Sequence, residues 1–114
     1  MKYSDEQRID KIIETWESVK KEISDRDITK ESLLNDIFTQ WAITTPLYNI
    51  GEQVYNLSSE FKQSYPEIKW NLVSGLRHRL VHNYEGINWS IIVEIVFEEM
   101  DVFINELRKI SKSK

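Results

Sequence analysis

The stretch NWSIIVEIVFEEMDVFINEL, residues 88–107, decides the fold class, because its apolar residues recur at steps of three and four, the period of an α-helix. Asn88 stands where it would cap the start of this helix. Val93 and Phe97 widen the apolar arc beyond that of a helix packed on one side. The stretch is therefore expected to be either the central helix or a helix that also contacts a partner. Its apolar stripe consists of Ile91, Ile92, Ile95, Val96, Met100, Phe103, Ile104 and Leu107.

Three more helices are expected before this one, joined by short polar segments. Ser4 and Gln7 have the spacing of a capping box at the start of the first helix, and Thr29 is the expected N-cap of the second. The third is expected to begin near Pro66 and to stop at Gly86. The apolar stripes of the three helices comprise Ile9, Ile12, Ile13, Trp16, Val19 and Ile23, then Leu33, Leu34, Ile37, Phe38, Trp41, Leu47, Ile50, Val54 and Leu57, then Trp70, Leu72, Val73, Leu76, Leu80 and Val81.

Two residues inside the second helix stand out. Pro46 lacks an N–H group and strains the turn before it, so a kink or break is expected near Thr44 and Thr45. Gly51 costs a helix roughly 1 kcal/mol relative to alanine, which favours a position where another helix packs closely. The pattern as a whole predicts an all-α protein, an antiparallel four-helix bundle, with one domain over residues 1–110 and a frayed tail over 111–114.

Composition excludes several classes of protein. The chain has 114 residues, 40% of them hydrophobic and 30% charged, with three glycines and two prolines, which excludes a disordered chain and a many-stranded sandwich. It has no cysteine, so disulfides, thiolate metal sites and cysteine nucleophiles are excluded. The net charge of −4 argues against a broad basic face for duplex binding but allows a local phosphate site. With neither a signal peptide nor an apolar run of about 20 residues, the chain is expected to be cytoplasmic, with no membrane contact.

The stretch GLRHRLVHNY, residues 75–84, holds both histidines of the chain and two arginines. Arg77 and His82 lie five positions apart, about 7.5 Å along a helix and about 140° around it, so they face one cleft only if the geometry loosens at the helix end. An imidazole that exchanges protons beside a guanidinium that stabilises negative charge suits RNA cleavage without a metal. The alternative is a surface arginine and a histidine placed at the favourable C-terminal end of a helix.

Other polar residues leave alternatives open. His78 and His82, four residues apart, share a helix face as zinc ligands do, but the chain has no third histidine and no metal is expected. Tyr84 could simply pack with its hydroxyl in water. Glu52 lies in an apolar stretch, where it would either pair with an arginine from another helix or remain solvated.

The spacing Arg77-x4-His82-x-Tyr84 resembles the R-x4-H-x-Y motif of HepT-like toxins in the HEPN superfamily. The wider context is similar too, most densely over residues 47–96. It includes Ile50-Gly51-Glu52, Tyr65-Pro66-Glu67-Ile68, Trp70, Gly75-Leu76-Arg77, Leu80-Val81-His82, Tyr84 and Ile87. The sequence departs from the family where Pro46 interrupts a helix that is usually long, and where no tryptophan stands near Val93 or Glu94.

The resemblance implies a metal-independent endoribonuclease toxin that needs no cofactor and acts as a homodimer whose motif helices face each other. It makes Arg77 and His82 the catalytic residues and Tyr84 the residue that an MNT-type nucleotidyltransferase antitoxin modifies with AMP. His78 and Arg79 are expected to help bind the RNA backbone, and two copies of this cluster would give an acidic chain a local cationic groove. The alternatives are a non-catalytic partner of the nucleotidyltransferase that binds nucleotide or protein in the same cleft, and a plain helical interaction module.

Overall fold

The computed structural model describes residues 3–81 and 86–112. Helix α1 (Asp5–Asp25) begins with the predicted capping box. The hydroxyl of Ser4 accepts the N–H of Gln7 at 3.1 Å, and the side chain of Gln7 accepts the N–H of Ser4 at 2.9 Å. The helix buries Ile12 and Trp16 against the rest of the core.

The second predicted helix is interrupted at Asp36, which separates α2 (Lys30–Asn35) from α3 (Ile37–Tyr55). The carboxylate of Asp36 accepts the N–H of Thr39 at 2.8 Å and its hydroxyl at 2.7 Å, and these hydrogen bonds hold the pKa of Asp36 below its ordinary value. A kink or break was expected near Pro46, and a break does not occur, because α3 continues through that residue. Ile43 and Leu47 are buried on either side of it, so packing maintains the helix despite the missing hydrogen bond.

Helix α5 (Trp70–Val81) follows the short helix α4 (Ser59–Gln63) and packs along α3. The closest approach is at Gly51, where an added Cβ would lie 2.6 Å from the backbone nitrogen of Arg77 and 3.3 Å from the Cβ of Leu76. The prediction that Gly51 marks close helix packing is confirmed. This contact brings Glu52, the residue after Gly51, next to Arg77 of α5.

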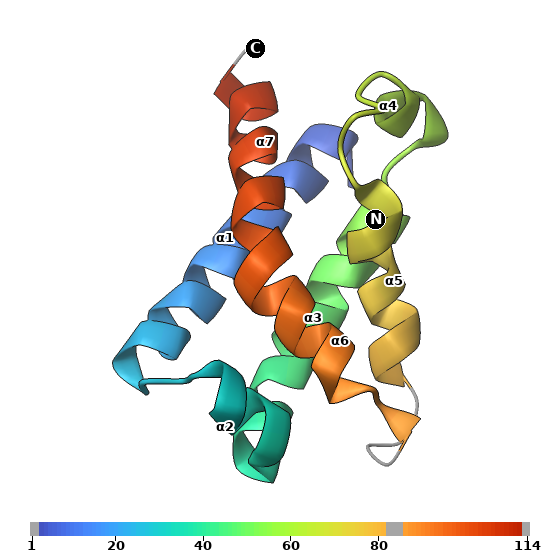
Figure 1. The fold of residues 1–114 in the computed structure, drawn as a ribbon. Coiled ribbons are helices and arrows are strands. Elements are labelled where there is room, and N and C mark those ends of the chain that lie inside the picture. The colour runs from blue at the N-terminus through green and yellow to red at the C-terminus, as the bar shows by residue number, and fades with distance from the viewer. Residues whose placement is uncertain (1–2, 82–85, 113–114) are drawn as a thin grey trace.

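The last long helical segment consists of α6 (Trp89–Glu94), a π-helical turn (Ile95–Glu99) and α7 (Met100–Lys112). The π turn contains more residues per turn than the α-helix, so it rotates the apolar face and lets residues on both sides of it reach the core. This explains the wide apolar arc in the sequence. The orange and red ribbon of this segment crosses α1 and α3 (Figure 1), and its buried side chains make it the central element. They include Ile92, Ile95, Met100, Ile104 and Leu107.

The all-α prediction is confirmed, since residues 3–81 and 86–112 form helices and connecting segments without any strand. The long helical segments α1, α3, α5 and α6–α7 run in alternating directions (Figure 1). None of the helices in these residues is long and apolar enough to span a bilayer.

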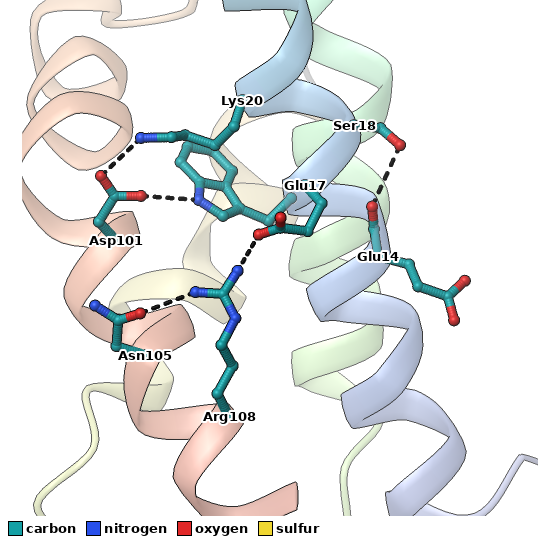
Figure 2. Close-up of polar contacts among 8 residues, drawn as sticks. Glu14, Glu17, Ser18, Lys20, Asp101, Asn105 and Arg108 are labelled. Carbon is teal, nitrogen blue, oxygen red and sulfur yellow. Dashed lines mark hydrogen bonds and ion pairs between the residues drawn. The ribbon is translucent and has the colours of Figure 1, made fainter.

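Polar contacts join α1 to α7 at the rim of the core (Figure 2). Asp101 accepts the indole N–H of Trp16 at 3.1 Å and the ammonium of Lys20 at 2.9 Å, and Arg108 pairs with Glu17. Partial burial disfavours the charged form of Asp101, but the hydrogen bonds from Lys20 and Trp16 outweigh it and hold the pKa of this carboxyl below its ordinary value.

Replacing Asp101 by alanine is expected to lower the free energy of unfolding by about 1–3 kcal/mol, because the indole N–H of Trp16, a residue only 1% exposed, would lose its acceptor. Asp101→Asn keeps that acceptor and removes only the exposed ion pair, so it should cost less than about 1 kcal/mol. Urea unfolding monitored by circular dichroism measures both changes.

The same variants carry a pH signature. Because the folded-state pKa of Asp101 is lowered, its contribution to stability is fully present above the ordinary pKa of an aspartate and is lost as the pH falls through the folded-state pKa. The wild-type protein should therefore lose stability on acidification more steeply than Asp101→Asn. Identical pH profiles would contradict this account of the carboxylate.

Candidate active site

Arg77 lies in the second half of α5, with about a third of its side chain exposed. Its Nε donates a hydrogen bond to Oε1 of Glu52 on α3, and the two side chains form an ion pair. Of the two alternatives for Glu52, pairing with an arginine from another helix is thus the one found. The pair forms because Gly51, the residue before Glu52, lets α3 approach the backbone of Arg77.

Tyr55 covers the same guanidinium from the next turn of α3. The Cζ of Arg77 lies 4.2 Å from the centre of the Tyr55 ring, a cation–π geometry, and Tyr55 is 55% exposed. The pKa of Arg77 is raised above its ordinary value, mainly by the hydrogen bond to Glu52. Burial lowers this pKa, while the charges of Glu52, Tyr48 and Tyr55 raise it further. The arginine is therefore a permanently charged group held in one orientation at the surface.

Of the other predicted site residues, two lie on α5 near Arg77 and two lie outside the described residues. His78 and Arg79 are exposed in the last turn of α5, about 100° and about 200° around the helix from Arg77. His82 and Tyr84 lie outside the described residues, so the predicted pairing of Arg77 with His82 stays a prediction. Within the described parts of the chain, no three His, Cys, Asp or Glu side chains come together in a way that could hold a metal ion.

Sequence reasoning missed Tyr48 and Tyr55 as neighbours of the arginine. The signal was present, because Tyr48, Glu52 and Tyr55 recur at steps of four and three and so share one side of α3. A cavity of about 660 Å³ beside α4, lined among others by Lys62, Lys69 and Trp70, contains none of the predicted site residues. Among the described residues, the candidate site is centred on the partly exposed side chain of Arg77.

A family model described as "Ribonuclease HepT-like" matches residues 7–110 of this chain. The chain belongs to the HepT-like ribonuclease family. The resemblance found in the sequence is thereby confirmed, and the all-helical fold agrees with it.

Named relatives of this HepT-like chain agree with the assignment. It is 30% identical over 112 residues to "Probable ribonuclease HepT" of Thermococcus cleftensis, and the aligned region covers 98% of this chain and all of the relative. It is 40% identical over 86 residues to "Putative RNase MJ0127" of Methanocaldococcus jannaschii, and the aligned region covers 75% of this chain and 71% of the relative. No solved structure matches the chain significantly.

Proposed function

We propose that this HepT-like protein is a metal-independent endoribonuclease toxin that cleaves RNA with Arg77 and His82. The observation that carries the proposal is the partly exposed guanidinium of Arg77 on α5, the helix that precedes His82 in the sequence. Glu52 and Tyr55 of α3 hold this guanidinium in place. Glu52 engages only Nε in this pair. A guanidinium has four further N–H groups, which are available in this geometry to bind a phosphate.

The proposed reaction is an internal transfer at phosphorus. His82, as general base, takes the proton of the ribose 2′-hydroxyl, whose oxygen attacks the adjacent phosphorus atom. Arg77 stabilises the negative charge that accumulates on the phosphate oxygens. The bond from phosphorus to the 5′-oxygen breaks, this oxygen takes a proton from a second acid or from water, and the products are a 2′,3′-cyclic phosphate and a free 5′-hydroxyl.

The proposed assembly is a homodimer paired with an antitoxin. Two copies of Arg77, His78 and Arg79 would supply a local positive charge on a chain whose net charge is −4. The antitoxin is an MNT-type nucleotidyltransferase that attaches AMP to Tyr84. An added phosphate at that position would repel RNA from the cleft and so silence the enzyme.

The catalytic assignment predicts that the purified protein degrades RNA in the presence of EDTA and leaves cyclic phosphate ends. His82→Ala should slow cleavage by about 100-fold or more, and Arg77→Lys should also lose most activity because an ammonium does not reproduce the planar fork of a guanidinium. Arg26→Ala is the matched control, since Arg26, the C-cap residue of α1, pairs with Glu22 of the same helix. Gel and mass analysis of a defined RNA measures all three rates.

Two outcomes would contradict the proposal. If His82→Ala and Arg77→Lys cleave RNA and arrest growth like the wild type, the catalytic assignment is wrong. If the wild type leaves RNA intact but binds the nucleotidyltransferase, the protein is instead a non-catalytic partner that uses the same surface for contact.

The proposed silencing predicts a mass change. Co-expression with the cognate nucleotidyltransferase should add one or more AMP units to the intact protein, and Tyr84→Phe should abolish the addition. Tyr65→Phe is the control, because Tyr65 lies in the connection between α4 and α5, against Phe61. AMP found on the Tyr84→Phe variant, or its absence from the wild type, would overturn this part of the proposal.

A further inference from the structure

Helix α3 holds two arginines that belong to different helices, and it lies between those helices (Figure 1). Glu52 pairs with Arg77 of α5. Gln53, the next residue of α3, accepts a hydrogen bond of 2.8 Å from Nη1 of Arg8 on α1. The Cζ of Arg8 also lies 5.6 Å from the centre of the Tyr3 ring, which is within the range of a cation–π contact. Arg8 is therefore positioned as Arg77 is, by one acceptor on α3 and one aromatic ring.

The charge of Arg8 is not compensated, unlike that of Arg77. The Gln53 side chain that accepts its hydrogen bond is a neutral amide, and no ion pair joins Arg8 to a carboxylate within the residues that the structure describes. Arg26, Arg77 and Arg108 each pair with a carboxylate. A partly buried cation without a counter-charge costs solvation free energy, which a bound anion would offset.

A second cation stands one helical turn away from Arg8. Lys11 lies three residues further along α1, so the two side chains project from the same side of the helix. Lys11 is exposed and belongs to none of the ion pairs in the described parts of the chain. It borders a cavity of about 80 Å³ together with Gln7 and with both partners of Arg8, Tyr3 and Gln53. The described lining of this cavity thus contains a cation, two amides and an aromatic ring.

Two carboxylates of α1 lie one turn from these cations, and neither compensates them. Asp5, three residues before Arg8, is engaged elsewhere, because its oxygens accept the N–H of Ser58 at 2.9 Å and its hydroxyl at 2.7 Å. Glu14, three residues after Lys11, forms no ion pair with it. Among the described residues, this side of α1 therefore offers two cations to an anion.

We infer that Arg8 and Lys11 form a second phosphate subsite, which binds the backbone of single-stranded RNA while Arg77 engages the phosphate that is cleaved. Cations beside an exposed aromatic ring, here that of Tyr3, are typical of surfaces that bind single strands. A duplex fits less well, because its binding depends on many neutralised phosphates and the chain has a net charge of −4. The inference rests on the proposed function for the role of Arg77 and adds where the rest of the strand binds.

The positions of the two arginine contacts on α3 suit different phosphates of one strand. Glu52 and Gln53 are consecutive, so their side chains leave the helix about 100° apart and hold the two guanidinium groups on different sides of it. Between these two directions α3 presents Asn49 and Asn56, both exposed. Their amides can donate hydrogen bonds to the sugar and base oxygens of the nucleotides in between. The strand would thus cross the C-terminal half of α3.

A 2′-O-methyl RNA oligonucleotide tests the subsite without cleavage, because its blocked 2′-oxygen cannot attack phosphorus. Fluorescence anisotropy should show that Arg8→Gln and Lys11→Gln each weaken binding at least about threefold and reduce its salt dependence, since each variant loses a phosphate contact. Lys21→Gln is the matched control. It removes the same charge from α1, where Lys21 pairs with Asp25, and should bind like the wild type.

Gln53→Glu tests the charge of Arg8 with both cations in place. The new carboxylate would still hold Arg8 but would compensate its charge, so binding of the oligonucleotide should fall at least about threefold. A purely structural role for Arg8 predicts unchanged binding. Gln63→Glu, which adds the same charge on α4, is the control and should bind like the wild type. Circular dichroism checks that each variant is folded.

Three results would overturn the inference. The first is a wild-type protein that does not bind the oligonucleotide. The second is a pair of folded Lys11→Gln and Gln53→Glu variants that bind it as the wild type does. The third is an equal loss of binding in the two control variants, because that would indicate a general effect of net charge.

Cleavage kinetics separate this inference from the proposed function. Because Arg8 and Lys11 bind RNA away from the bond that breaks, their variants should raise KM and leave kcat within about twofold of the wild type. A wild-type protein that binds the oligonucleotide through these residues but leaves RNA intact contradicts the ribonuclease assignment alone. An active enzyme whose variants keep the wild-type KM and affinity contradicts the subsite alone.

Discussion

The arrangement of the candidate site depends on one close contact between backbones, where Gly51 of α3 meets the N–H region of Arg77 on α5. Any side chain at position 51 would push the two helices apart, because its Cβ would come within 2.6 Å of the Arg77 nitrogen. With the contact in place, the next residue, Glu52, reaches the guanidinium, and Tyr55 stacks on it one turn later. The packing of two helices thus fixes the direction of a surface arginine.

The energetics of this cluster suit a functional role better than a structural one. In the Arg77–Glu52 pair, about a third of each side chain is exposed to solvent. Ion pairs with this exposure contribute little to the free energy of unfolding. What the pair and the Tyr55 ring supply is restricted rotation of a long side chain that would otherwise sample many rotamers. A fixed cation costs less to organise around a phosphate than a mobile one, which is the property that the proposed reaction requires.

Much of the fold follows from local patterns that the sequence displays. The capping box at Ser4, the cap at Thr29 and the apolar stripe of α1 are all decided within a few residues, and all were predictable. The Asp36 cap was missed because the helical spacing continues past it. A kink or break was expected near Pro46 because local patterns do not show the burial of Ile43 and Leu47, a tertiary effect that maintains the helix there. The stretch 75–84 and the family resemblance both pointed to Arg77, but its partner on α3 depended on which helices pack together.

The central claim is that close packing at Gly51 positions Arg77, and the direct measurement is urea unfolding of Gly51→Ala against Gly75→Ala. Both replace a glycine inside a helix, but a Cβ at Gly75 would meet nothing within 4 Å. The account predicts that Gly51→Ala lowers the free energy of unfolding by about 1–3 kcal/mol through overpacking. Gly75→Ala should leave it unchanged or raise it by up to about 1 kcal/mol. Equal stability of the two variants would contradict the account.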